Sequence, residues 1–116
     1  MKNFKICNKF FQAFQEKNMK NISEMIHKSI ELKDWEIVTK GDRKFLKVIQ
    51  KIFDSVDSIS IIIKNQGIQS DGGIQSVNIF NEIEIHFNNT EKLEIVDIIE
   101  IELKSKLIKS IRAYKR

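Results

Sequence analysis

Apolar residues recur at two different periods along this chain, and the change of period divides it into two halves. In residues 1–55, apolar residues fall three or four positions apart, the spacing of amphipathic helices. In residues 57–114, they mostly alternate with polar residues, the spacing of strands that bury one face. The pattern therefore predicts helices first and strands afterwards.

The first half predicts three helices, with residues 30–38 between the second and third as one short strand or extended loop. Asn18 is placed to cap the second helix, and Gly41-Asp42 begins the third. The apolar sides of the three helices are Phe4, Cys7, Phe11 and Phe14, then Met19, Ile22, Met25 and Ile26, then Phe45, Val48, Ile49, Ile52 and Phe53.

The second half predicts four antiparallel strands at residues 57–64, 77–87, 93–103 and 107–114, with turns at Asp71-Gly72-Gly73 and Asn88-Asn89-Thr90. Helices and strands that are segregated in this way indicate an α+β fold. A length of 116 residues fits one domain, residues 1–116, with one core. A long twisted sheet is expected to curl around the helices and leave a concave space between the two layers.

Asp97 interrupts the apolar face of the third of these strands. The alternation places it between Ile95 and Ile99 on the face that points to the core. A buried carboxylate without partners is costly to ionise, so it stays protonated with a raised pKa or finds donors. We therefore expect Asp97 in a pocket; the alternatives are pairing with Arg112 or Lys115 on the neighbouring strand, or a place at a β-bulge.

Composition and charge narrow the function classes. The net charge of +4 lies mostly in residues 104–116, without the dense basic clusters and stacking aromatics of nucleic-acid surfaces. Cys7 is the only cysteine, and we interpret it as a buried thiol on a helix. His27, at the end of the second helix, and His86, on a solvent-facing strand side, stand apart, so we expect no metal site and no cofactor.

Neither a secretory leader nor an apolar stretch long enough to cross a bilayer is visible, so we expect a cytoplasmic protein without membrane contact.

Several segments, taken in order, resemble the nuclear transport factor 2-like superfamily, in the SnoaL-like branch that is related to ketosteroid isomerases. The resemblance covers nearly the whole chain. It implies a cone-shaped α+β half-barrel with an apolar cavity, often dimerised through the outer face of the sheet. The segments are the aromatic first helix, Asn18-Met19, residues 31–35 (Glu-Leu-Lys-Asp-Trp), Gly41, residues 93–97 (Leu-Glu-Ile-Val-Asp) and residues 108–114 (Ile-Lys-Ser-Ile-Arg-Ala-Tyr).

The resemblance also implies roles for two carboxyl groups. Asp34 stands where the isomerases have their general base, and Asp97 where they keep a neutral carboxylic acid that donates to the developing oxyanion. Phe10 stands where those enzymes have a tyrosine, so one oxyanion donor is missing. Because losing one such donor costs a factor of about a hundred or more in rate, efficient steroid isomerisation is not expected.

Two functions are compatible with this resemblance. The first is a pocket for a small apolar carbonyl compound, with proton-transfer catalysis of the isomerase, dehydratase or cyclase kind. The second is a non-catalytic ligand-binding or dimerisation module. Trp35 either stacks on a ligand at the cavity mouth or packs the end of the half-barrel. The expected pocket residues are Phe10, Phe14, Trp35, Ile95, Ile99, Ile111 and Ala113.

Overall fold

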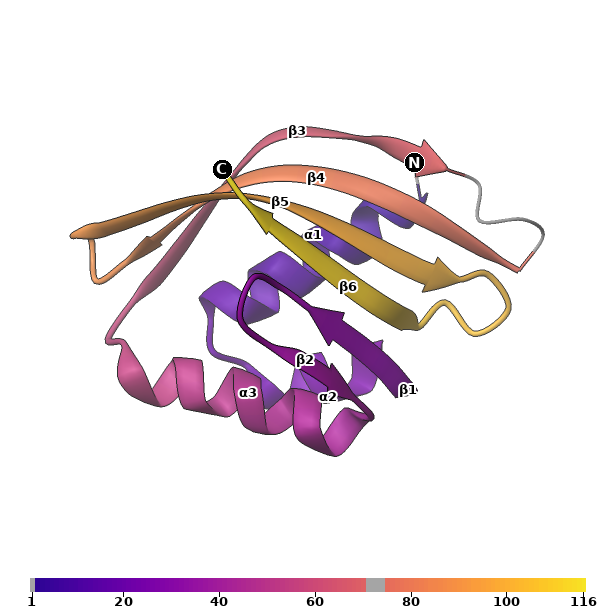
Figure 1. The fold of residues 1–116 in the computed structure, drawn as a ribbon, viewed down its shortest axis with the longest axis horizontal. Coiled ribbons are helices and arrows are strands. Elements are labelled where there is room, and N and C mark those ends of the chain that lie inside the picture. Colours follow the sequence, from indigo (N-terminus) through magenta and orange to yellow (C-terminus); the bar gives the residue numbers. More distant parts are fainter. Residues whose placement is uncertain (1, 71–74) are drawn as a thin grey trace.

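The structure, a computed structural model, describes residues 2–70 and 75–116. This part of the chain forms three helices and six strands, whose arrangement can be followed in Figure 1. The expected turn at Asp71-Gly72-Gly73 lies outside the described residues. The elements are α1 (Lys2–Gln15), α2 (Met19–Met25), β1 (Ile26–Lys33), β2 (Val38–Lys40), α3 (Asp42–Ser55), β3 (Ile59–Ser70), β4 (Ser76–Phe87), β5 (Glu91–Glu102) and β6 (Ile108–Lys115).

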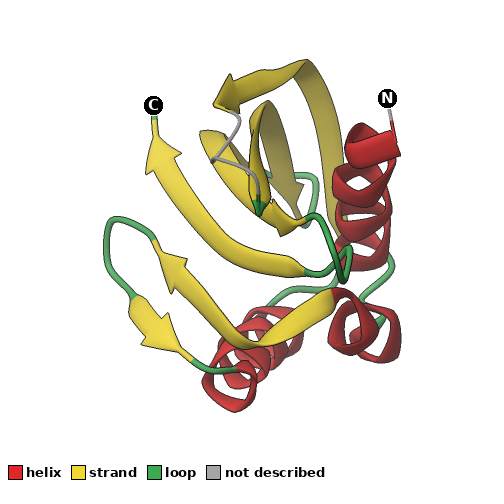
Figure 2. Ribbon diagram, turned by 90° about the vertical axis from the view of Figure 1, so that its right-hand side faces the viewer, coloured by secondary structure: helices red, strands yellow, loops and turns green. Residues whose placement is uncertain are grey.

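All six strands form one sheet in the order β2-β1-β6-β5-β4-β3. β3 to β6 make an antiparallel meander, β1 and β2 form a hairpin, and β1 joins the meander by pairing parallel to β6. The sheet curves strongly without closing, and the helices lie on its concave side (Figure 2). The predicted α+β fold, with three helices on a curved and mainly antiparallel sheet, is confirmed.

The region around the second helix differs from the prediction. Asn18 caps α2 as expected, accepting a hydrogen bond from the Asn21 amide at 3.0 Å. The helix ends at Met25, however, and Ile26 begins a strand by pairing with Ile108 of β6. Apolar spacing alone could not reveal this boundary, because the pairing that ends the helix comes from 82 positions further along the chain.

Two other boundaries were also wrong. Residues 30–38, expected as one short strand or extended loop, instead contain the end of β1, a turn and the start of β2, which pair as a hairpin. The strand expected at residues 57–64 continues to Ser70, with shifts of register between Ile63 and Asn65 and between Ile68 and Ser70. These bulges interrupt the simple alternation that the sequence pattern relied on.

The core fills the space between the concave face and the helices. Phe45 of α3, Ile22 of α2 and Ile99 of β5 are fully buried there, together with the inward-facing isoleucines of β4 and β5. No helix in the described part of the chain has the length and apolar character needed to span a bilayer.

Gly41 sets the start of α3 through a backbone conformation that only glycine adopts easily. Its φ is 98° and its ψ is 150°, its amide donates to the Ile30 carbonyl at 2.8 Å, and its carbonyl accepts from the Phe45 amide. A Cβ here meets no atom within 4 Å, so a substitution is strained by the backbone alone.

We expect Gly41→Ala to lower the free energy of unfolding by about 1–3 kcal/mol, measured by urea denaturation. Gly67→Ala is the matched control, because a Cβ at Gly67 also meets no atom within 4 Å and the backbone there does not have a positive φ. Its effect should stay within about 0.5 kcal/mol. Equal effects of the two substitutions would show that the backbone at Gly41 is not strained by a side chain.

Candidate functional site

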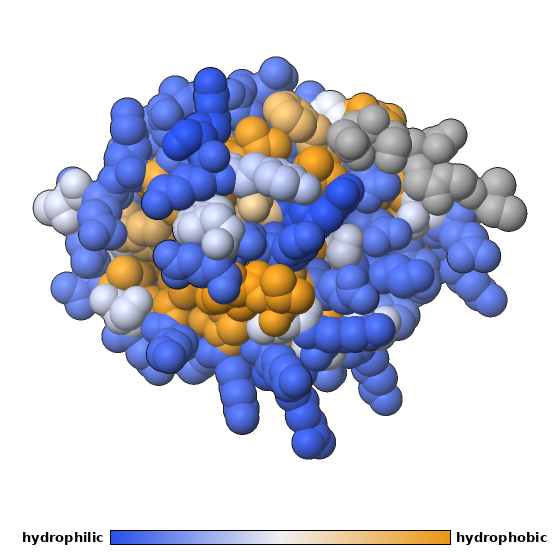
Figure 3. Space-filling model, viewed as in Figure 1, coloured by the Kyte–Doolittle hydropathy of each residue, from blue (hydrophilic) through white to orange (hydrophobic). Residues whose placement is uncertain are grey.

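A pocket of about 170 Å³ lies between the concave face of the sheet and the helices. Figure 3 shows apolar side chains gathered between α3 and the sheet, with polar side chains around them. Two carboxyl groups, Asp34 and Asp97, interrupt the apolar lining. The other lining residues are Phe10 and Phe14 of α1, Phe45, Val48, Ile49 and Ile52 of α3, Leu32 and Trp35 at the β1–β2 hairpin, and Ile85, Phe87, Leu93, Ile95, Ile111 and Ala113 of the meander.

Asp97 points into this pocket from the centre of β5. Its residue is only 7% exposed, and its carboxyl group has no hydrogen bond or ion pair with any residue that the structure describes. Burial, and secondly the negative charge of Asp34, raise the pKa of Asp97 from 3.8 to about 7. The group is therefore an acid poised to hold or release a proton near neutral pH.

Neither cation that the sequence offered as a partner pairs with Asp97. The register Ile98↔Arg112 puts Arg112 on the opposite, convex face, and the Lys115 ammonium lies 5.5 Å from the centre of the Trp35 ring. The register of Asp97 itself is regular, with Asn81 on one side and Ala113 on the other, so it does not lie at a bulge. Among the residues that the structure describes, Asp97 thus has no partner for its carboxyl group.

Asp34 follows β1 and holds the loop that leads to β2. Its Oδ1 accepts hydrogen bonds from the amides of Glu36 at 2.7 Å and Ile37 at 2.6 Å, and its own amide donates to the Ile37 carbonyl. This is the local turn that Asp favours, and it fixes the carboxyl group at the edge of the pocket. Oδ2 accepts no hydrogen bond from the described residues, so it is available to a ligand.

The structure places most of the expected pocket residues around this space. Phe10, Phe14, Trp35, Ile95, Ile111 and Ala113 line the pocket together with both carboxyl groups. Ile99 does not, because it is fully buried in the core beyond the pocket. Trp35 is 42% exposed and lies at the mouth.

Behind Asp97 lies a buried amide that the sequence pattern had not singled out. Asn81 is fully buried on the inner face of β4; its Nδ2 donates to the Asp97 backbone carbonyl at 3.3 Å, and its Oδ1 accepts from Gln66 Nε2 at 2.7 Å. The alternation in β4 carries the signal, since residue 81 falls on the apolar face between Ile79 and Ile83. Asn81 ties β4 to β5 at the level of the acid.

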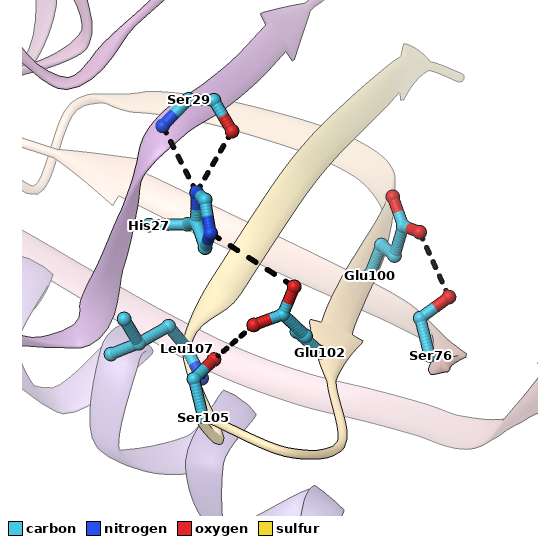
Figure 4. A network of polar contacts seen from close by, with 7 residues as sticks. All are labelled: His27, Ser29, Ser76, Glu100, Glu102, Ser105 and Leu107. Atoms are coloured by element: carbon cyan, nitrogen blue, oxygen red, sulfur yellow. Dashed lines mark hydrogen bonds and ion pairs between the residues drawn. The ribbon is translucent and has the colours of Figure 1, made fainter. Parts of the chain in front are cut away.

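The remaining candidates lie away from the pocket. His27 is in β1 rather than at a helix end; its Nδ1 accepts from the Ser29 amide and its Nε2 lies 3.9 Å from Glu102 Oε2 (Figure 4). His86 Nε2 lies 2.9 Å from Glu84 Oε2 on the convex face, and this hydrogen bond lowers the pKa of Glu84.

The Cys7 thiol and possible clusters of metal ligands were the other candidates for a reactive site. Cys7 is fully buried, and burial raises the pKa of its thiol to about 12, which keeps it protonated and unreactive. Within the described ranges, no group of three or more His, Cys, Asp or Glu side chains is arranged to hold a metal ion.

At the level of sequence, no protein-family model matches the chain, and no curated protein does either. Solved structures do match its fold. An NTF2-like protein of unknown function from Cytophaga hutchinsonii superposes with a TM-score of 0.77 at 10% identity, covering 98% of this chain and 89% of that one.

Two further solved structures with a similar fold belong to proteins whose names state a type of enzyme. A putative SnoaL-like polyketide cyclase from Shewanella putrefaciens has a TM-score of 0.77 at 10% identity, covering 99% of this chain and 80% of that one. SalBIII, an epoxide hydrolase/cyclase-like enzyme of pyran ring formation in salinomycin, has a TM-score of 0.76 at 19% identity, covering 99% and 91%. At these identities the likeness extends to the architecture alone, and the chain therefore has the nuclear transport factor 2-like fold.

Proposed function

We propose that this protein binds a small apolar carbonyl compound in the pocket and catalyses proton transfer next to the carbonyl group. The observation that carries the proposal is Asp97, an unpaired acid inside an apolar cavity that a second carboxyl group, Asp34, also lines. Two titratable groups with different environments in one cavity are the usual basis for separate acid and base roles. The fold neighbours named for cyclisation and epoxide chemistry support the proposal at the level of architecture.

The size of the pocket limits the compound. Its volume of about 170 Å³ is close to that of a dry cavity of about 150 Å³ that accepts benzene. The inner pocket therefore accommodates one six-membered ring or an acyclic chain of similar size. A four-ring steroid does not fit in it, in agreement with the missing tyrosine at position 10.

The proposed step needs both carboxyl groups in opposite protonation states. Asp34 takes a proton from the carbon next to the carbonyl, and the C–H electron pair moves into an enolate. The O–H of Asp97 donates to the enolate oxygen, where the negative charge develops. Asp34 then returns the proton to the same carbon or to another carbon of the conjugated system, which yields exchange or isomerisation.

Hydrogen–deuterium exchange tests this step without knowledge of the natural substrate. In D₂O at neutral pD, the protein should accelerate exchange of the α-protons of cyclohexanone, followed by NMR. Asp34→Asn should lower this catalysed rate about a hundredfold, because general-base catalysis contributes that much or more. The asparagine Oδ1 can still accept the amides of Glu36 and Ile37, so the loop is retained.

Asp57→Asn is the matched control, because Asp57 is exposed and does not line the pocket. It makes the same chemical change and should leave the exchange rate unaltered. A wild-type protein that exchanges cyclohexanone no faster than an equal concentration of acetate would contradict the catalytic proposal.

The second candidate is a non-catalytic module that dimerises through the convex face. Apolar side chains on this face favour it: Ile62 and Tyr114 are 45% and 51% exposed, and Phe80, Val96 and Ile98 are half-buried. Under this alternative, Asp34→Asn changes neither ligand affinity nor dimerisation, and the exchange experiment gives no catalysed rate in any variant.

A further inference from the structure

A second hollow adjoins the mouth of the inner pocket. It measures about 360 Å³ and is lined by Lys33, Asp34, Trp35, Ala113, Tyr114 and Lys115, which together we call the vestibule. Asp34, Trp35 and Ala113 line both spaces. A molecule seated in the inner pocket therefore extends into the vestibule when it is longer than one ring.

The position of Lys115 in the vestibule is set by the sheet. Its register opposite Ile95 puts its side chain on the concave face, on the same side as a residue of the inner pocket. The next residue, Arg116, holds the strand end through a hydrogen bond from its amide to the Glu94 carbonyl at 3.0 Å. The side chain of Lys115 then reaches across to Trp35, with Nζ 5.5 Å from the ring centre.

The two lysines of the vestibule carry charge that the described residues do not neutralise. Neither Lys33 nor Lys115 forms an ion pair with a described side chain, whereas Lys40, Lys92 and Arg116 do. Asp34, which lines the same space, supplies one negative charge against their two positive charges. The net positive charge of the vestibule therefore favours an anionic group of a ligand. The exposed Trp35 ring offers an apolar surface to the ligand carbons next to that group.

We propose that the ligand carries a carboxylate that binds in the vestibule, with Lys115 as the main specificity determinant. This inference rests on the proposed function, since it assumes that the apolar part of the ligand occupies the inner pocket. The substrate class is thereby narrowed to carboxylic acids with an apolar body of about one ring. A singly charged carboxylate fits better than a phosphate dianion, because Asp34 repels added negative charge.

Three probes that differ only in their polar end test the inference: 3-phenylpropanoate, 3-phenylpropanamide and 3-phenylpropylamine. Trp35 is the only tryptophan, so its fluorescence reports binding at the mouth. The carboxylate should bind about five- to tenfold more tightly than the amide, and the ammonium form of the amine most weakly. The preference should shrink in 1 M salt, where the screening length falls to about 3 Å.

Lys115→Gln should reduce the affinity for the carboxylate to that for the amide and leave the affinity for the amide unchanged. Lys51→Gln, an equal loss of charge at an exposed position of α3 outside both hollows, should leave the carboxylate preference intact. Equal affinities for carboxylate and amide, or an undiminished preference in Lys115→Gln, would overturn the inference.

The amide also separates this inference from the proposed function. When its ring enters the inner pocket, it removes water from Asp97 and should raise the midpoint of the Asp97 titration measured by NMR. An amide that raises this midpoint without a carboxylate preference rejects the vestibule site alone. An amide that neither binds nor moves the midpoint rejects the pocket function, and the vestibule inference with it.

Discussion

Raising the pH from about 4 to about 8 is expected to lower the free energy of unfolding by about 4 kcal/mol through Asp97 alone. Burial, and secondly the charge of Asp34, raise the pKa of this carboxyl group from 3.8 to about 7. Each pKa unit corresponds to about 1.4 kcal/mol. For a domain of this size, the loss corresponds to about 15 °C in melting temperature.

The direction of this pH dependence follows from whether the folded or the unfolded state releases the Asp97 proton at the lower pH. Below about 3.8, Asp97 is protonated in both states, and the full stability is present. Between 3.8 and about 7, the unfolded chain has released the proton while the folded protein still holds it, so stability falls as pH rises. Above about 7, both states are ionised and the loss is complete.

Asp97→Asn isolates this contribution from the other titrating groups. The amide cannot ionise, so the difference in stability between wild type and variant should change across this pH window by the stated amount. Asp34→Asn should move the Asp97 midpoint downward, because it removes the second cause of the shift. Urea denaturation at a series of pH values measures the free energy of unfolding of all three proteins. If this free energy changes with pH in parallel for wild type and Asp97→Asn, Asp97 is not a buried acid without a partner.

The position of Asp97 could be predicted from the sequence because β5 is regular. All twelve residues of β5 pair with β4 in unbroken register from Glu102 to Glu91, so strict alternation held and residue 97 had to face the core. The same rule applied to Asn81 on β4, where a polar residue again interrupts an apolar face. Alternation thus locates polar residues in the core wherever a strand has no bulge.

Contacts distant in sequence could not be predicted in the same way. The parallel pairing of β1 with β6 joins residues 26–33 to residues 108–112, and no local pattern encodes it. This pairing ends α2 at Met25 and brings the loop after β1, with Asp34 and Trp35, beside the end of β6. The face of β5 that carries Asp97 could therefore be identified from the sequence, whereas the approach of Asp34 and Trp35 to the inner pocket and the vestibule depends on a topology that only the structure provides.

The turn at Asp34 fixes the local backbone with a residue that also lines the inner pocket. One carboxyl oxygen is bonded to two loop amides, and the same loop carries Trp35 to the mouth. Because the turn fixes this oxygen, the other is held at the pocket without a separate supporting residue. A carboxyl group positioned in this way loses little freedom when a ligand binds.

Removal of the Phe45 ring is expected to be the most destabilising single truncation among the pocket residues. Phe45 is fully buried and lines the inner pocket from α3. Phe45→Ala should lower the free energy of unfolding by about 3–5 kcal/mol, as measured by urea denaturation, because the ring is lost and a cavity remains. That cavity is continuous with the existing pocket, so the variant contains a larger apolar space than the wild type.

An apolar ligand should therefore restore part of the lost stability. Toluene should raise the melting temperature of Phe45→Ala more than that of the wild type, because the enlarged apolar cavity accepts such a ring and binding stabilises the folded state. Phe11→Ala is the matched control: its ring is 3% exposed on α1 and does not line the pocket. It should lose similar stability without the additional gain from toluene. If toluene stabilises both alanine variants equally, the space that it fills is not the pocket that holds Asp97, and the size limit placed on the ligand no longer applies.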